Sequence, residues 1–158
     1  MYTYKYPRPA LTVDAIVFVK DPFSVLLIRR GKEPYKGKWA LPGGFVEMNE
    51  LLEVACIREL GEETGLEIEE MQQFRAFDSI GRDPRGRTIS VVFFTELGSL
   101  PEVRGGDDAD LAGWFSFFDL PPMAFDHQQI LQDFYNKKIL YEKQHLFFLC
   151  MLSLTNTW

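Results

Sequence analysis

Three glutamates on one predicted helix constrain this chain more than any other feature. In the stretch from Gly44 to Leu66, GFVEMNELLEVACIRELGEETGL, Glu59, Glu62 and Glu63 fall at positions i, i+3 and i+4. On an α-helix these positions lie within about 100° of arc, so one face presents three carboxylates. Grouped like charges destabilise a helix unless a cation offsets them. Hard oxygen ligands of this kind suit Mg²⁺ or Mn²⁺, which are commonly shared with substrate phosphates.

The residues around these glutamates favour a metal site over the alternative of an ordinary solvated acidic face. At about 100° per residue, the apolar residues in or beside the same arc are Leu52, Ala55, Cys56 and Leu60. The acids therefore point towards packed structure rather than open water. Val54 and Ile57 lie on the far side of the helix, and we expect packed structure to cover that face as well.

The same stretch resembles the Nudix box, G-x5-E-x7-R-E-U-x-E-E-x-G-U, in which U is an aliphatic residue. Every fixed position of that pattern is matched, by Gly44, Glu50, Arg58, Glu59, Leu60, Glu62, Glu63, Gly65 and Leu66. The preceding segment GKWALPGGFVE also looks like the approach to the box in that family. The chain therefore resembles a Nudix hydrolase. The resemblance implies an α/β fold, namely the Nudix α/β/α sandwich with a mixed central sheet.

The resemblance also implies a role for each part of the box. It places the metal ligands at Glu59, Glu62, Glu63 and the carbonyl of Gly43, with Mg²⁺ as the cofactor and Mn²⁺ as an alternative. A bound cation neutralises a pyrophosphate and lowers the pKa of the water that attacks phosphorus. Arg58 lies on the same helix, where it can reach neighbouring carboxylates and hold the loop before the helix.

The sequence leaves open which residue accepts the proton from that water. Glu50 and Glu63 are candidates within the box. In several Nudix subgroups the base lies on a loop outside the box, and the acidic loop at 104–110 offers Asp107 and Asp108. The alternative for this loop is an ordinary solvated turn.

The segment RDPRGRT, which begins at Arg82, contains the predicted substrate-binding residues. Arg82, Arg85 and Arg87 offer fork-shaped donors for phosphate or for a ribose hydroxyl, although Asp-Pro and Arg-Gly are also ordinary turn chemistry. Pro84 lies close to the position at which the ADP-ribose pyrophosphatase subgroup has a proline. LAGWF at 111–115 and AFDH at 124–127 also resemble that subgroup.

Three aromatic residues are candidates for stacking on an adenine ring. Tyr35, Phe45 and Phe77 are the three that the pattern offers. Core packing is the commoner role for any single aromatic residue, so the sequence does not choose among them.

These resemblances imply hydrolysis of the pyrophosphate bond of ADP-ribose, or of a related nucleoside diphosphate linked to another group, giving AMP and ribose 5-phosphate. A non-catalytic ADP-ribose sensor is the alternative from another class, because similar domains occur fused to DNA-binding regions. Its carboxylates are often degraded, whereas all three are present here, and we expect no DNA-binding region after Lys138. Clearance of oxidised nucleoside triphosphates is a third possibility, which would not need the arginine segment.

Composition sets the remaining expectations. The chain has 158 residues, 46% of them hydrophobic, which is enough for one domain with a substantial core. A net charge of −6 argues against nucleic acid as a partner, because no basic stripe is available. The N-terminus has no apolar signal core and no apolar run is long enough to cross a bilayer. We therefore expect a cytoplasmic protein without membrane association.

The end of the chain is predicted to differ from the rest. We expect one Nudix domain over residues 1–138, followed by an apolar tail over 139–158 that packs on the domain or on a partner. The run from Leu146 to Leu152 is too short to cross a bilayer, so it should be buried. We predict a homodimer with the tail in its contact; the alternative is a tail that folds back on its own domain.

Hydrophobic periodicity predicts the order of the elements. The helix that holds the three glutamates is expected over about Leu51 to Thr64, with Asn49 as its cap and Gly65 just beyond its end. A second helix is expected from near Asp126 to about Lys138. The expected strands are Ala10 to Val19, Ser24 to Ile28, Trp39 to Leu41, and the runs around Met71 to Phe77, Thr88 to Thr95 and Gly113 to Phe117.

Overall fold

Four strands, one helix, three strands and two helical segments follow one another along the described part of the chain, which comprises residues 4–106 and 109–141 of a computed structural model. The strands are β1 (Ala10–Lys20), β2 (Phe23–Arg30), β3 (Trp39–Ala40), β4 (Gly43–Phe45), β5 (Gln72–Phe77), β6 (Thr88–Leu97) and β7 (Ala109–Ser116). The helices are α1 (Leu52–Thr64), α2 (His127–Phe134) and the π-helical segment η1 (Tyr135–Leu140).

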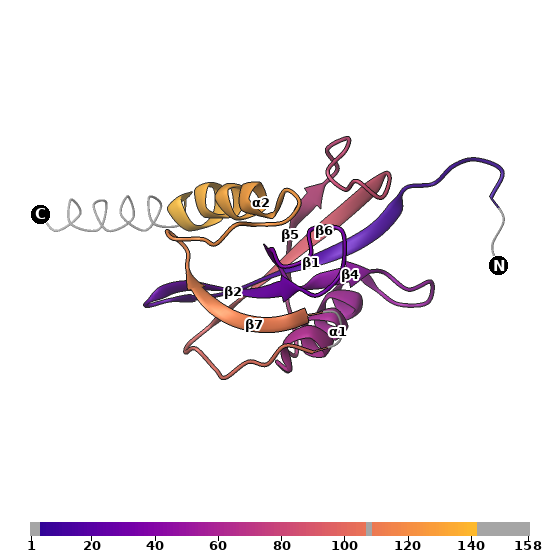
Figure 1. Ribbon diagram of the computed structural model, residues 1–158. Coiled ribbons are helices and arrows are strands. Elements are labelled where there is room, and N and C mark those ends of the chain that lie inside the picture. Colours follow the sequence, from indigo (N-terminus) through magenta and orange to yellow (C-terminus); the bar gives the residue numbers. More distant parts are fainter. Residues whose placement is uncertain (1–3, 107–108, 142–158) are drawn as a thin grey trace, which may run out of the picture.

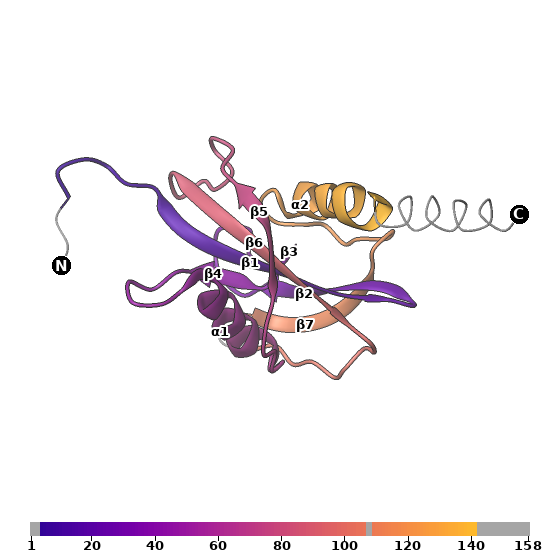
Figure 2. The same ribbon diagram turned by 180° about the vertical axis from the view of Figure 1, so that it is seen from behind.

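Strand β1 organises the sheet, because it pairs with three other strands. It runs parallel to β6 and antiparallel to β2 and β4, so the sheet is mixed. The main path has the order β3-β2-β1-β6-β5, with β4 paired to β1 and β7 paired to β2. Helices α1 and α2 lie on opposite sides of the sheet, as Figures 1 and 2 show. This arrangement is the predicted α/β/α sandwich with a mixed central sheet.

The alternation of side chains along β1 divides the core into two layers. Val13, Ala15 and Val17 are fully buried and pack with buried residues of α1. Ile16 and Phe18 point to the other side, where they pack with buried residues of α2. Successive side chains of a strand face opposite sides, so one long apolar strand supplies both layers.

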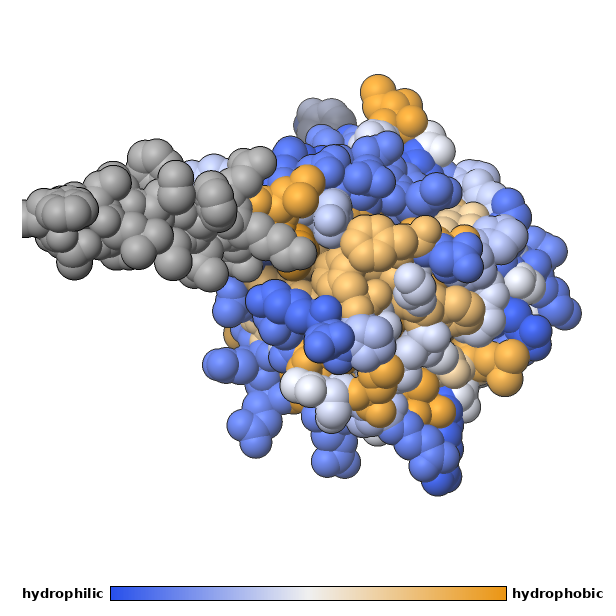
Figure 3. All heavy atoms as spheres, turned by 90° about the vertical axis from the view of Figure 1, so that its left-hand side faces the viewer, coloured by the Kyte–Doolittle hydropathy of each residue, from blue (hydrophilic) through white to orange (hydrophobic). Residues whose placement is uncertain are grey.

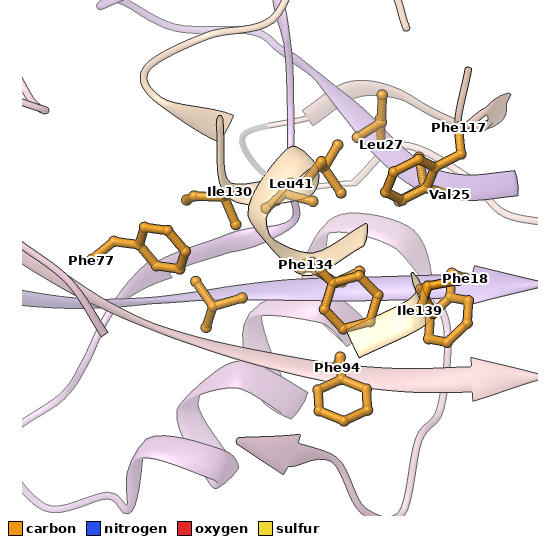
Figure 4. Close-up of a cluster of buried hydrophobic side chains, with 13 residues drawn as sticks. Phe18, Val25, Leu27, Leu41, Phe77, Phe94, Phe117, Ile130, Phe134 and Ile139 are labelled. Atoms are coloured by element: carbon orange, nitrogen blue, oxygen red, sulfur yellow. The ribbon is translucent and has the colours of Figure 1, made fainter. Parts of the chain in front are cut away.

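The layer beneath α2 is built around Phe134, which is fully buried. Its ring centroid lies 5.4 Å from that of Phe18 on β1 and 5.2 Å from that of Phe94 on β6. Figure 4 shows these rings together with Ile130 and Ile139, which reach the same cluster from α2 and η1. This packing fixes α2 against the sheet, and with it the turn before the helix.

Helix α1 ends as predicted but begins differently. Gly65 has a left-handed φ of 71° and its N–H donates to a backbone carbonyl of the last turn at 2.8 Å, a conformation that glycine adopts at little cost. At the other end the N-cap is Leu51, which forms no side-chain capping bond, so the predicted Asn49 cap is wrong. The preceding turn is held by Glu50, whose carboxylate accepts from the N–H of Glu47 at 2.7 Å.

Three further local expectations differ from the structure. Gly43, Gly44 and Phe45 form strand β4 against β1, where the sequence analysis expected no strand. The second helix changes to π-helical geometry after Phe134 and continues to Leu140. Ile57 packs against the core beside α1, but Val54 is 51% exposed, so the expectation that both are covered is wrong for Val54.

Aromatic side chains gather beside the junction of α2 and η1. Figure 3 views this side of the molecule and shows hydrophobic residues among hydrophilic ones. The rings of Phe23 and Phe117 stack there with centroids 4.6 Å apart, and Phe118 is 71% exposed beside Tyr135. The chain continues beyond η1 into residues 142–158, which are outside the described residues.

The predicted boundary after residue 138 falls within η1. Ile139 is 3% exposed and belongs to the core beneath α2. The apolar run from Leu146 to Leu152 lies outside the described residues, so the homodimer and the role of the tail stay predictions. Within the described residues, no helix combines the length and the apolar character that crossing a membrane requires.

Removal of residues 142–158 tests the predicted homodimer. The cut is placed after Tyr141 because a cut after Lys138 would remove the buried Ile139. We expect light scattering to show a dimer for the full chain at tens of micromolar and a monomer for the shortened chain, since the apolar run would be lost from the contact. A monomeric full chain would contradict the dimer, and a shortened chain that stays dimeric would remove the tail from its contact.

Candidate active site

A cavity of about 310 Å³ is lined by residues of β1, β4, α1, the loop between β5 and β6, and the turn before α2. The cavity brings together most of the residues that the sequence singled out. Those that line it are Gly43, Arg58, Glu59, Glu62, Glu63, Arg82 and Arg85. Glu50, Pro84 and Arg87 are not part of the lining. The predicted metal ligands and two of the predicted substrate ligands therefore share one space.

Two glycines allow β4 to approach α1 and β1 closely. A Cβ atom on Gly44 would lie 2.4 Å from the carboxyl carbon of Glu59, and one on Gly43 would lie 2.1 Å from the carbonyl oxygen of Val13. A side chain on Gly43 would therefore require the strand to move, whereas one on Gly44 would displace the carboxylate of Glu59. In this position the N–H of Gly43 donates to Oε2 of Glu63 at 2.9 Å. Strand β4 thereby holds the carboxylates of α1 at the cavity wall.

Burial perturbs two of these carboxylates. Glu63 is 5% exposed, and burial raises its pKa to about 8 against a partial opposing effect of the Gly43 hydrogen bond. Burial also raises the pKa of Glu59, although the hydrogen bond from Arg58 opposes the shift. Both groups therefore hold a proton more tightly than an ordinary glutamate does. A nearby cation would relieve this penalty on the charged form.

Arg58 contacts three carboxylates of the box. Its Nε and Nη2 donate to the two oxygens of Glu50 at 3.0 and 2.7 Å. Its Nη1 donates to Glu59 at 2.8 Å and to Glu62 at 3.2 Å, and Nη2 also reaches the carbonyl of Phe45 at 3.3 Å. The hydrogen bond with Glu50 raises the pKa of Arg58 and lowers that of Glu50. Arg58 thus ties the loop before α1 to the helix.

The donor set of this wall fits a hard divalent cation. Glu59, Glu62 and Glu63 supply carboxylate oxygens to one cavity, beside the close backbone approach at Gly44. Within residues 4–106 and 109–141, no three His, Cys, Asp or Glu side chains already converge as a metal-binding group. Arg58 instead occupies oxygens of Glu59 and Glu62. A cation bound here would exchange with those contacts of Arg58.

A buried polar network beside the carboxylates was missed by sequence reasoning. Asp14 on β1 accepts a hydrogen bond from Ser90 on β6 and lies 3.7 Å from Arg82. Arg82 donates twice to Asp126, at 2.9 and 2.7 Å, and its side chain is only 5% exposed. Burial disfavours the charge of Arg82, but these carboxylates raise its pKa overall. The available signal was a charged aspartate within a largely apolar predicted strand.

His127 joins the same network from the first turn of α2. Its Nδ1 accepts from the N–H of Leu41 at 2.8 Å, so in the neutral ring Nε2 has the proton. That Nε2 lies 3.5 Å from Oδ1 of Asp14. Burial lowers the pKa of His127, which favours the neutral form. The histidine therefore anchors the backbone just before β4, in agreement with a structural role.

The other predicted substrate residues occupy different positions around the loop between β5 and β6. Arg85 lines the cavity and donates to the buried carboxylate of Asp83, with Nη2 at 2.7 Å. Arg87 points elsewhere, because its Nη1 donates to the carbonyl of Asp78 at 2.6 Å. Pro84 is exposed next to the cavity residues. The structure therefore brings Arg82 and Arg85, but not the whole segment, to the cavity.

Asp107 and Asp108, the candidates for an external base, lie outside the described residues. The backbone just before them is described and packs against the last turns of α1. The N–H of Gly106 donates to the carbonyl of Glu63 at 3.2 Å. A Cβ atom on Gly106 would lie 2.4 Å from the carbonyl oxygen of Glu62. This loop is thus anchored at the helix that presents the carboxylates.

Comparisons with known proteins agree with this geometry. The family model of the NUDIX domain matches residues 8–134. The ADP-ribose pyrophosphatase of Methanocaldococcus jannaschii is 45% identical over 130 residues, covering 82% of this chain and 75% of that protein. The ADPR responsive transcriptional repressor NtrR of Acinetobacter baylyi is 33% identical over 133 residues, covering 80% of this chain and 53% of that protein.

A solved structure extends the likeness to three dimensions. It is that of a bifunctional NMN adenylyltransferase/ADP ribose pyrophosphatase from Francisella tularensis, complexed with AMP and a manganese ion. The TM-score is 0.78 at 35% identity, and the match covers 85% of this chain and 43% of that chain. The chain therefore belongs to the Nudix hydrolase family. It spans about half the length of the repressor and less than half of the bifunctional enzyme.

The raised pKa of Glu63 predicts how stability depends on pH in the presence of a chelator. The folded-state pKa of about 8 exceeds the ordinary value of 4.5, so the folded state binds more protons between these values. The contribution of Glu63 to the free energy of unfolding therefore falls as pH rises through this window, by up to about 1.4 kcal/mol per pH unit.

Denaturant titrations of the wild type and Glu63→Gln at several pH values measure this slope. The glutamine keeps the hydrogen bond with Gly43 but cannot titrate. The free energy of unfolding of the wild type, relative to that of Glu63→Gln, should therefore fall from pH 5 to about pH 8. Glu69→Gln, at an exposed position outside the cavity lining, should keep the wild-type slope. Equal slopes for the wild type and Glu63→Gln would show that Glu63 titrates normally.

Proposed function

We propose that this protein hydrolyses the pyrophosphate bond of ADP-ribose, or of a related nucleoside diphosphate linked to another group, giving AMP and ribose 5-phosphate. The reaction would require a divalent cation, Mg²⁺ or Mn²⁺. The observation that carries the proposal is the shared cavity, in which Glu59 and Glu63 meet Arg82 and Arg85. Such a cavity offers acids for a cation and cationic side chains for an anionic substrate.

The substrate class is supported by what similar proteins are named for. The pyrophosphatase of Methanocaldococcus jannaschii, the repressor of Acinetobacter baylyi and the enzyme of Francisella tularensis are each described with ADP-ribose. The last was solved with AMP, which is the nucleotide product proposed here, and with manganese. A net charge of −6 would repel a pyrophosphate, so the cation and arginines have to offset that repulsion locally.

The cation would be held by Glu59, Glu62 and Glu63, with the carbonyl of Gly43 as a further ligand. When bound, it would screen the pyrophosphate and lower the pKa of a bound water. Arg58 would then keep its two bonds to Glu50 while its contacts to the other glutamates are exchanged. The side chain would continue to fix the loop before α1 in both states.

Glu63 fits the role of general base better than Glu50 does. Glu63 lines the cavity, where a general base has to lie within hydrogen-bond reach of the attacking water. Both oxygens of Glu50 accept bonds from Arg58, and Glu50 is not part of the cavity lining. We therefore assign Glu50 a positioning role. Asp107 and Asp108 stay candidates for a base supplied by the adjacent loop.

A non-catalytic ADP-ribose sensor is the second candidate, favoured by the likeness to a repressor that is ADPR responsive. The two functions share a ligand but differ in turnover. Binding of ADP-ribose without release of AMP, at saturating Mg²⁺ and at saturating Mn²⁺, would support the sensor. Release of AMP at a rate proportional to the protein concentration would support the hydrolase.

Removal of single carboxylates tests the metal site. Glu62→Gln and Glu63→Gln should each lower kcat by about a hundredfold or more at saturating Mg²⁺, because the lost charge weakens the cation that activates water and screens pyrophosphate. Circular dichroism should show intact folds. Glu69→Gln serves as the control at an exposed glutamate outside the cavity and should keep wild-type activity. Near wild-type turnover in both cavity variants would remove the proposed site.

A substrate panel tests the proposed specificity. Among ADP-ribose, NADH, diadenosine polyphosphates and 8-oxo-dGTP, ADP-ribose should have the highest kcat/KM. Arg85→Ala should weaken substrate interactions about tenfold to a hundredfold, the usual cost of one charged hydrogen bond or contact. Arg87→Ala should cost less, because Arg87 bonds to the Asp78 carbonyl and does not line the cavity. A strong preference for a triphosphate would defeat the assignment.

A further inference from the structure

One part of the cavity lining consists of flat side chains rather than carboxylates. Phe45 of β4 is 48% exposed, and Phe125 lies in the turn before α2; both line the cavity. The guanidinium carbon of Arg85 lies 5.1 Å from the ring centroid of Phe45 and 5.6 Å from that of Phe125. Three planar groups from distant segments therefore meet in the space that Glu59 and Glu63 also line.

The orientation of Arg85 is fixed by Asp83. Its Nε donates to Oδ1 at 3.0 Å and its Nη2 to Oδ2 at 2.7 Å. Although burial disfavours the charged form of Asp83, the hydrogen bonds from Arg85 hold the pKa of that carboxyl below its usual value. Phosphate binding by these two nitrogens would compete with this pair. Stacking on the face of the guanidinium does not compete with it.

Neighbouring side chains contact the ring of Phe125 from several sides, whereas Phe45 is about half exposed. Phe125 has a left-handed φ of 51°, which is unfavourable for a bulky residue and requires support from its neighbours. The ring of Tyr35 meets it edge-on at 4.9 Å, and the guanidinium of Arg30 lies 5.0 Å from its centroid. Phe45 lines the cavity and is 48% exposed, and it also borders a second hollow formed with residues 4–11. An open aromatic face beside a guanidinium is a platform for another flat π-system.

We propose that Phe45, with Arg85 beside it, forms the nucleobase subsite of this cavity. The base of the nucleotide stacks on the open face of Phe45, while its phosphates lie towards Glu59 and Glu63. The inference rests on the proposed function only in taking a nucleotide as the ligand. In such a ligand the base is the aromatic group, whereas ribose and phosphate have no π-face to stack. Base stacking on an aromatic side chain tolerates different bases, so Phe45 contributes affinity more than choice of base.

Calorimetric titration of the full chain with separate parts of the substrate tests this subsite. The probes are AMP, ribose 5-phosphate and inorganic pyrophosphate, each in the presence of Mg²⁺. Phe45→Ala and Phe45→Leu should each weaken AMP binding by about tenfold or more. Binding of ribose 5-phosphate and pyrophosphate should not change. Phe45→Trp should keep AMP affinity and gain a fluorescence quench with AMP that pyrophosphate does not cause.

Matched controls separate stacking from a general effect on the fold. Phe118→Ala removes another exposed phenylalanine, outside the cavity, and should leave AMP binding unchanged. Phe45→Leu keeps an apolar side chain of similar size, so a loss in this variant reports the missing π-face. Unchanged AMP affinity in both the alanine and leucine variants would overturn the proposal. Equal losses for AMP and pyrophosphate would also overturn it.

The same titrations distinguish this proposal from the proposed activity. AMP binding is measured without turnover, so it does not depend on whether ADP-ribose is hydrolysed. A protein that binds AMP through Phe45 but releases no AMP from ADP-ribose would refute the activity and support the subsite. A protein that hydrolyses ADP-ribose with AMP affinity independent of Phe45 would refute the subsite alone.

Discussion

The geometry of this cavity depends on the hydrogen bonds between the guanidinium of Arg58 and the carboxylates around it. Three carboxylates within little more than one helical turn repel one another, and two of them accept hydrogen bonds from Arg58. The same group binds Glu50 through two nitrogens and reaches the carbonyl of Phe45. Five donors in a rigid fork allow one residue to fix a loop and a helix face together. One side chain therefore ties Glu50, Glu59 and Glu62 to the backbone of Phe45, whereas Glu63 is held by the N–H of Gly43.

A second set of contacts joins the sheet to the arginine side of the cavity. Asp14 sits near the middle of β1, opposite Gly43 of β4, and accepts from Ser90 of β6. It also lies near Arg82 and His127, which belong to the loop before β6 and to α2. A buried carboxylate is costly unless it is paired, and here its partners come from β6, the loop before β6 and α2. The strand that divides the core thus also connects the two walls of the cavity.

A bound cation and a bound substrate would disturb different contacts: the cation would affect those of Arg58, and the substrate would meet Arg82 and Arg85. Exchange of Arg58 contacts at Glu59 and Glu62 would leave its pair with Glu50 in place, so the loop would keep its position while the carboxylates are rearranged. The pair between Arg82 and Asp126 is nearly inaccessible to solvent on the arginine side, whereas Arg85 is about two fifths exposed. A ligand therefore meets a fixed arginine and a more accessible one.

The sequence by itself determined the features that depend on neighbours along the chain. The spacing of the glutamates placed them on one helix face, and Gly65 marked the left-handed end of α1, because both follow from local backbone geometry. Only the tertiary structure decided which other groups meet them. His127 and the Leu41 N–H are 86 positions apart, and Ser90 and Asp14 are 76 apart. No periodicity records such pairs, since they arise when packing brings distant strands and loops together.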